Sequence, residues 1–184
     1  MVPGVALPAS TRADSRRRLP ADQQIRPISP ARKGYNVMAS KNEAAIRHAY
    51  QVAEDKDLQG FVNCFTPDGT FTDQSIGVTY KGQDIAVTVD NYAKAFPDMH
   101  RELYRFYEDG NIVIVELAFQ GTHLGPLPLP TGNIPATGKR MDAPCADVFE
   151  LADGKIKRFN CYPSGTVILT QLGVLENLSS HLQH

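Results

Sequence analysis

The hydrophobic period of this chain changes at Pro97 from the period of helices to the period of strands. Before Pro97, apolar residues recur at helical spacing, first in the set Ile46, Ala49, Tyr50, Val52 and Ala53. After it, the chain is built from extended segments rich in β-branched and aromatic residues, at 99–107, 112–120, 139–151 and 155–162. Helices followed by a run of strands predict an α+β fold, with one sheet that carries helices on one face.

The helical half has clear boundaries. Ser40 and Glu43 have the spacing of a capping box and predict that the first helix begins there. A second, short helix is predicted from Leu58, Phe61, Val62 and Phe65, and a third from Ile85, Val89, Tyr92 and Phe96. Pro97 ends the third helix. Between the second and third helices we expect a turn at 66–69, a short strand at 70–73 and an extended piece around 78–80.

The strand half is divided by turn signals. Asp109-Gly110-Asn111 and Asp153-Gly154 predict tight connections between neighbouring strands. Residues 122–138 contain four prolines and three glycines and are expected to form a loop, and 166–172 is apolar and fits either a strand or a short helix. The expected result is a curved antiparallel sheet, half covered by three N-terminal helices, with an internal pocket for a small ligand at its open end.

Charge divides the chain at residue 39. Residues 1–39 hold seven Lys or Arg and two Asp, together with five of the thirteen prolines, and show no apolar period. We therefore expect a disordered basic tail at 1–39, a single domain at 40–178 and a polar C-terminal tail at 179–184. The tail has no apolar segment typical of a secretory signal.

Composition excludes several classes of function. The rest of the chain is acidic, with twelve Lys or Arg against eighteen Asp or Glu, so we expect no nucleic-acid partner. No apolar run reaches the ~18 residues of a membrane span, so no membrane partner is expected. Three cysteines without CxxC spacing predict a reducing, cytoplasmic location and no metal site. Phosphate-binding glycine motifs are absent, and no cofactor is expected.

Two longer strings resemble a known family. AFPDMHRELYRFYEDGNIVIVELAFQGTHLGPL and DVFELADGKIKRFNCYPSG…QLG, in this order of elements, are similar to the SnoaL-like polyketide cyclase and ketosteroid-isomerase-like branch of the nuclear-transport-factor-2-like superfamily. The resemblance covers roughly residues 40–178 and implies a cone-shaped sheet around a deep pocket. It also implies a homodimer that pairs through the outer face of the sheet. The fold hosts isomerases, cyclases, dehydratases and non-catalytic binding modules, so it identifies the reaction poorly.

The resemblance assigns roles to particular residues. It places Tyr50 at the oxyanion-supporting tyrosine of the first helix, and Asp73 at the general base, in the string GTFTDQSIG. The protonated acid of the isomerase branch falls on Pro144, with Asp142 two residues earlier on the same strand face. The acid/base Asp of the cyclase branch falls on Ser164, which cannot act as a base without a partner.

Two further residues, His123 and Asp147, complete the candidate catalytic set. His123 begins the long loop, where members of the family often line the pocket. Asp147 shares its strand face with Cys145 and Phe149, and is therefore either a pocket acid or a buried structural acceptor. Asp73 and Tyr50 have structural alternatives too, as a turn residue and as a core tyrosine with a bonded hydroxyl. The remaining residues expected to line the pocket are Tyr92, Phe96, Asp142 and Tyr162.

The sequence thus predicts a small cofactor-independent enzyme that moves a proton next to the carbonyl of a compact apolar substrate, by isomerisation, cyclisation or dehydration. Asp73 is the expected base, and Tyr50, with Asp147 or His123, is expected to stabilise the oxyanion. The alternative is a non-catalytic ligand-binding or dimeric scaffold domain, favoured by the residues at positions 144 and 164.

Overall fold

The computed structural model describes residues 39–175 of the chain. The elements follow one another as α1 (Lys41–Glu54), α2 (Leu58–Asn63), β1 (Phe65–Asp73), β2 (Val78–Lys81), a 3₁₀ turn η2 (Gly82–Ile85), α3 (Ala86–Ala95), β3 (His100–Asp109), β4 (Ile112–Thr122), β5 (Leu127–Leu129), β6 (Gly132–Ile134), β7 (Arg140–Ala152), β8 (Lys155–Pro163) and α4 (Gly165–Gln171). The change of period at Pro97 therefore marks the passage from helices to the long strands. Of the predicted tails, 179–184 and all of 1–39 except its last residue lie outside the described residues.

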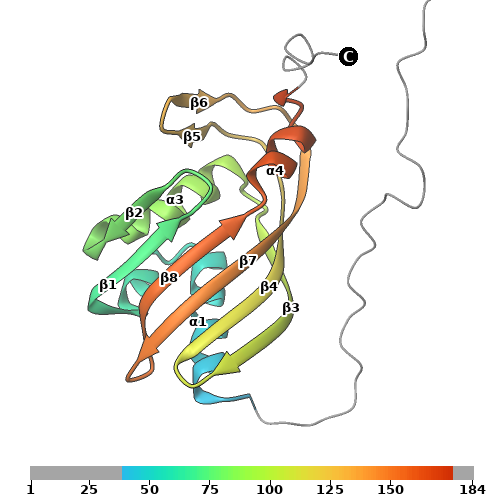
Figure 1. Cartoon of the computed structure of the whole chain (residues 1–184). Helices are drawn as coiled ribbons and strands as arrows, with labels where there is room; N and C mark the ends of the chain where they lie inside the picture. The colour runs from blue at the N-terminus through green and yellow to red at the C-terminus, as the bar shows by residue number, and fades with distance from the viewer. Residues whose placement is uncertain (1–38, 176–184) are drawn as a thin grey trace, which may run out of the picture.

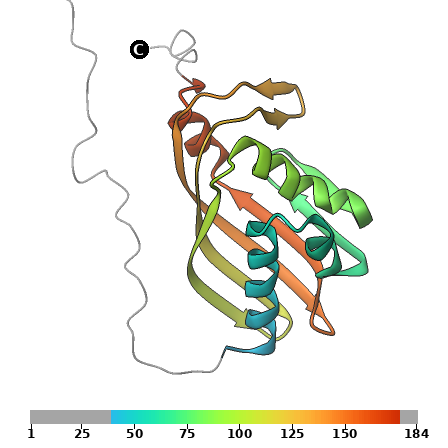
Figure 2. The ribbon, with the colours of Figure 1, turned by 180° about the vertical axis from the view of Figure 1, so that it is seen from behind.

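Six strands form one curved sheet in the order β2-β1-β8-β7-β4-β3, which confirms the α+β class. The helices lie on its concave side, where α1 crosses the long strands and α3 lies beside the β5–β6 hairpin (Figures 1 and 2). The sheet is open, because β2 and β3 are its two edges.

One pairing differs from the predicted antiparallel sheet. β1 runs parallel to β8, with Asp73 opposite Cys161, so the sheet is mixed. Turn signals identify strands that are neighbours in the sequence, whereas β1 pairs with the last strand of the chain. Such a long-range parallel pairing leaves no local trace in the sequence.

Alternation along the long strands separates an inner face from an outer one. In β7 the buried positions are Met141, Ala143, Cys145, Asp147, Phe149 and Leu151, and the positions between them are exposed or half-buried. β4 supplies Val113, Val115 and Leu117 to the same core. The inner face of the sheet and the apolar stripe of α1 form one core, and the candidate site lies within it.

The predicted loop contains a short hairpin, and the segment with two predicted alternatives is a helix. Within the predicted loop 122–138, β5 and β6 pair as a short hairpin, with Leu127 opposite Ile134. The apolar segment 166–172 belongs to the helix α4, which is in contact with β7. Among the described residues, no helix is both long and apolar enough to cross a membrane.

The predicted start of α1 is confirmed. Ser40 is the N-cap, and its side chain accepts a hydrogen bond of 3.0 Å from the backbone N–H of Glu43. The Glu43 carboxylate pairs with Arg47 one turn further on.

Replacing Ser40 with Ala is expected to lower the free energy of unfolding by about 1 kcal/mol, because one helix N–H loses its acceptor. Urea unfolding of the variant measures this loss. Ser40→Thr, which keeps a hydroxyl, should recover most of it, and equal stability of Ser40→Ala and the wild type would show that the cap contributes nothing.

A candidate active site in the concave face of the sheet

An apolar cavity of about 130 Å³ lies between the sheet and the helices. Its polar lining residues include Tyr50, Asp73, Tyr92, Arg101 and Asp147, and the β5–β6 hairpin contributes Leu127 and Leu129 to its wall. An enclosed apolar space of ~150 Å³ holds a molecule the size of benzene. The cavity therefore suits a compact ligand that meets a small number of polar groups.

The most buried polar group of the cavity is Asp147. Its side chain has no solvent exposure, and the Tyr50 hydroxyl donates a hydrogen bond of 2.7 Å to its Oδ2 atom. Burial raises the pKa of Asp147 to about 6, although hydrogen bonds from Tyr50, Cys161 and Cys145 act against the rise. Burial also raises the pKa of Tyr50 well above its usual value, with the Asp147 charge as the next cause. The pair thus keeps a phenol beside a carboxyl group that gains its proton near neutrality.

Two thiols lie close to the Asp147 carboxyl group. Cys145 Sγ lies 3.3 Å from Asp147 Oδ1 and 3.8 Å from Cys161 Sγ. Within the described part of the chain, these three residues are the one group of His, Cys, Asp and Glu side chains close enough together to hold a metal ion. The hydrogen bond with Cys161 lowers the pKa of Cys145, but burial and the Asp147 charge bring it to about 11, so both thiols keep their protons and donate hydrogen bonds.

Asp73 lies at the end of β1 and lines the same cavity. It is 9% exposed, and its Oδ1 atom accepts hydrogen bonds from the backbone N–H of Ser75 at 2.9 Å and from the Ser75 hydroxyl at 2.6 Å. Asp73 and Asp147 are both opposite Cys161, on either side of β8. Their backbones are therefore two strand spacings apart, about 10 Å, with both side chains on the inner face.

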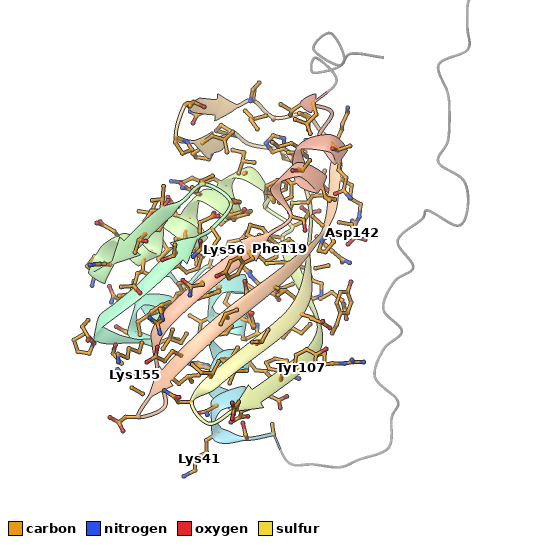
Figure 3. The ribbon with its side chains drawn as sticks, viewed as in Figure 1. Lys41, Lys56, Tyr107, Phe119, Asp142 and Lys155 are labelled. Atoms are coloured by element: carbon orange, nitrogen blue, oxygen red, sulfur yellow. The ribbon has the colours of Figure 1, made fainter. Side chains whose placement is uncertain are left out.

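Tyr92 of α3 and Arg101 of β3 also belong to the polar lining. Burial raises the pKa of Tyr92 well above its usual value, and the charge of Asp73 adds to the rise. Arg101 Cζ lies 5.6 Å from the centroid of the Phe119 ring, on the neighbouring strand β4. Phe119, which Figure 3 labels, also lines the cavity.

Two residues predicted for this site lie behind the cavity wall. His123 is fully buried and stacks on Phe96, with ring centroids 5.1 Å apart, and its Nδ1 atom is 3.0 Å from the Thr137 hydroxyl. Neither His123 nor Phe96 lines the cavity. Burial lowers the pKa of His123, so the ring is neutral at pH 7. These contacts of His123 stabilise the segment that follows β4. The prediction that His123 belongs to the site was wrong.

Two other predicted pocket residues lie on the outer face of the sheet. Asp142 is exposed, and its Oδ1 atom accepts a hydrogen bond from Gln120, while its backbone bonds Gln171 of α4 (Figure 3). Tyr162 is 46% exposed. Strand alternation explains both errors, because buried Cys145 and Asp147 define the inner face of β7 and Cys161 that of β8.

The structure also shows where the two positions lie at which the family resemblance implies an acid, Pro144 and Ser164. Pro144 is exposed on β7, so an acid there would point away from the cavity, whereas Asp147 of the same strand points into it. Ser164 is the N-cap of α4, and its backbone N–H bonds the carbonyl of Pro144. Neither position belongs to the cavity lining.

Sequence reasoning missed Arg101, Ser75 and Cys161 as cavity residues. Arg101 could have been found, because it shares strand parity with the apolar Leu103. Ser75 could also have been found, because it follows Asp73 by two residues in the same turn. Cys161 comes opposite Asp73 only through the parallel pairing of β1 with β8.

Comparison with known proteins agrees with this architecture. Residues 46–159 match the family model of the SnoaL-like domain. No curated protein matches the chain significantly. Many solved structures share the fold.

Three of these structures illustrate the likeness. A protein with a ketosteroid isomerase-like fold from Catenulispora acidiphila, solved in complex with trimethylamine, is 20% identical, has a TM-score of 0.60 and covers 70% of this chain and 92% of its own. A proposed SnoaL-like polyketide cyclase from Jannaschia sp. CCS1 is 17% identical, with a TM-score of 0.63 and coverage of 76% and 96%. IdmH, a proposed polyketide cyclase from Streptomyces antibioticus, is 18% identical, with a TM-score of 0.62 and coverage of 73% and 99%. At these identities the likeness shows the fold alone.

Proposed function

The chain belongs to the SnoaL-like domain family, and from this premise we propose that it is a small enzyme that transfers a proton on a compact, largely apolar carbonyl compound. The observation that carries the proposal is that Asp73 and the Tyr50–Asp147 pair line one apolar cavity. A base on one side of a bound molecule and an oxyanion donor on the other are what enolisation requires. The reaction needs no cofactor.

Asp73 is the base in this proposal. Its carboxylate removes a proton from the carbon next to the carbonyl, so that the C–H bond breaks and its electrons form an enolate. The N–H and hydroxyl of Ser75 hold Oδ1, which fixes the orientation of the carboxylate. Return of the proton to another carbon gives isomerisation, attack of the enolate on a second carbonyl gives cyclisation, and loss of a hydroxyl gives dehydration.

Tyr50 and Asp147 stabilise the oxyanion together. When Asp147 is ionised, the Tyr50 hydroxyl donates to it. When Asp147 is protonated, its own O–H can donate to the Tyr50 oxygen, which frees the phenolic proton for the substrate oxyanion. Burial, which raises the pKa of Asp147 to about 6, favours the protonated form, and a substrate that excludes water strengthens this effect. A buried neutral carboxylic acid is a known means of strengthening an oxyanion site.

Tyr50→Phe tests this role, because it removes one oxygen and keeps the ring. We expect the exchange of α-protons for deuterium in 2-cyclohexenone, followed by NMR, to slow by about 10²–10³-fold. Tyr162→Phe is the matched control, since that hydroxyl lies on the outer face, and it should exchange at the wild-type rate. An unchanged rate in Tyr50→Phe would remove the tyrosine from the mechanism.

The second candidate function is a binding domain that uses the cavity without proton transfer, with a homodimer paired through the sheet as its scaffold form. The two hydrogen bonds that Asp73 Oδ1 accepts from Ser75 favour it, because a purely structural turn residue makes the same bonds. Binding of the same compound with no isotope exchange in the wild type would select this function.

A further inference from the structure

The mechanism leaves one charged group of the cavity unused, the guanidinium of Arg101. Arg101 is half-buried near the start of β3, opposite Phe119. It lines the main cavity, and it also lines two adjoining hollows, one beside α3 and one between α1 and β3. A cation therefore lies where these spaces meet.

The guanidinium has no carboxylate partner among residues 39–175, in which every ion pair within 4.0 Å involves other cations. Glu54 contacts the backbone of Arg101 and not its guanidinium. The Glu54 Oε1 atom accepts a 2.7 Å hydrogen bond from the backbone N–H of Arg101 and lies 3.2 Å from His100 Nδ1. By contrast, Arg47 pairs with Glu43, and Arg158 pairs with Glu150. The contact of the Arg101 head with the protein is with the Phe119 ring.

An unpaired guanidinium beside an apolar cavity is a receptor for an anion. Its planar fork of N–H groups binds a carboxylate through two parallel hydrogen bonds, and partial burial strengthens that interaction. The charge of Arg101 already acts across the cavity. It partly opposes the rise that burial causes in the pKa of Asp147 and of Tyr92.

We propose that Arg101 binds a carboxylate group of the substrate, so that the enzyme acts on a compact carbonyl compound that is also a carboxylic acid. This rests on the proposed function, because it names the substrate class of the same cavity. In the sheet order β2-β1-β8-β7-β4-β3, Asp73 comes from β1, Asp147 from β7 and Arg101 from β3. The substrate therefore lies with its reacting C–H toward β1, its carbonyl at the Tyr50–Asp147 pair and its carboxylate toward β3.

This orientation of the substrate also agrees with the charges of Asp73 and Arg101. Asp73 would repel a carboxylate, and it lies on the strand at the far side of β8, β7 and β4 from Arg101. The cavity of about 130 Å³ limits the apolar part of the acid to roughly one six-membered ring, since ~150 Å³ holds benzene.

Benzoate and benzamide are suitable probes, because they share size and ring but differ in charge. With the full chain at neutral pH, calorimetric titration is expected to show benzoate binding at least about tenfold more tightly than benzamide. Arg101→Gln should abolish this preference and leave benzamide binding unchanged. Arg101→Lys should keep part of it, because the charge remains and the fork is lost. Arg105→Gln is the matched control from the same strand, with an exposed side chain, and should behave as the wild type.

The outcomes separate this proposal from the proposed function. Equal affinities for the two probes in the wild type, or a benzoate preference that survives in Arg101→Gln, would overturn the anion site even if isotope exchange is observed. A benzoate preference that depends on Arg101, with no exchange in any carbonyl compound, supports the anion site and counts against the enzyme. Should Arg101→Gln fail to fold, a several-fold loss of benzoate affinity in Arg101→Lys alone supports the same conclusion, and no loss contradicts it.

Discussion

Asp73→Asn is expected to lower the rate of α-proton exchange by about 10²–10⁴-fold, because the amide cannot accept the proton that the carboxylate removes. The substitution keeps the shape of the side chain and an oxygen for the Ser75 hydroxyl and N–H. Ligand binding and the free energy of unfolding should therefore change little. Deuterium incorporation into 2-cyclohexenone, measured at saturating and at low concentration, separates the loss of kcat from any change in KM.

Asp142→Asn provides the matched control for this experiment. It removes a carboxylate from the outer face of the sheet, where Asp142 accepts a hydrogen bond from Gln120 and does not line the cavity. Its exchange rate should equal that of the wild type. Equal rates in Asp73→Asn and the wild type would exclude Asp73 as the base and leave Asp147 as the remaining carboxylate of the cavity.

In the wild type, ionisation of Asp147 is expected to lower the free energy of unfolding as the pH rises, and Asp147→Asn should abolish this loss. The pKa of Asp147 is raised from 3.8 to about 6 in the folded state, so between these values the folded chain holds a proton that the unfolded chain has released. Bound protons in the native state mean that the free energy of unfolding falls as the pH rises through this window. A shift of about two pKa units corresponds to about 3 kcal/mol, a loss that is complete above pH 6.

The measurement is the difference in unfolding free energy between Asp147→Asn and the wild type, by urea unfolding at pH 4 and at pH 7. This difference should move by about 3 kcal/mol in favour of the variant as the pH rises. Using the difference removes the contributions of other acids, such as Asp98, whose pKa is lowered by hydrogen bonds from Thr122. A difference that is the same at both pH values would contradict the raised pKa.

The prediction for Asp147 reflects a compromise between stability and chemistry. A carboxyl group with no solvent exposure destabilises the fold when it is ionised, and it stabilises an oxyanion when it is protonated. An asparagine at position 147 would keep a polar contact for Tyr50 without the ionisation cost. An acid at this position, in place of an amide, is what the proposed chemical role of the Tyr50–Asp147 pair requires.

Local patterns in the sequence predicted the elements well where the interactions are local. The Ser40 cap, the helix stop at Pro97 and the Asp109-Gly110-Asn111 turn all depend on residues within a few positions of one another. The β5–β6 hairpin was missed, because Pro and Gly residues conceal two three-residue strands. The β1–β8 pairing was missed because its two strands lie far apart in the sequence.

Part of the candidate site could be predicted from strand parity, which is the alternation of side chains between the two faces of a strand. Asp147 shares parity with Cys145 and Phe149, and it lies on the inner face with them. Parity also shows, once one inner residue is known, that Asp142 points outward. It gives no information on His123, because that residue lies just beyond the end of β4, where alternation ceases.

The sequence by itself determined the class of fold, the ends of most elements and a short set of polar residues able to do proton chemistry, because hydrophobic period, caps and turns are properties of neighbouring residues. Only the tertiary structure decided which of those residues share a cavity. It brought Asp73, Tyr50, Asp147 and the unforeseen Arg101 together from β1, α1, β7 and β3, and it set His123, Phe96, Asp142 and Tyr162 elsewhere. The physical reason is that the curvature of the sheet and the parallel pairing of β1 with β8 select the side chains that converge, and both are long-range features that no local pattern specifies.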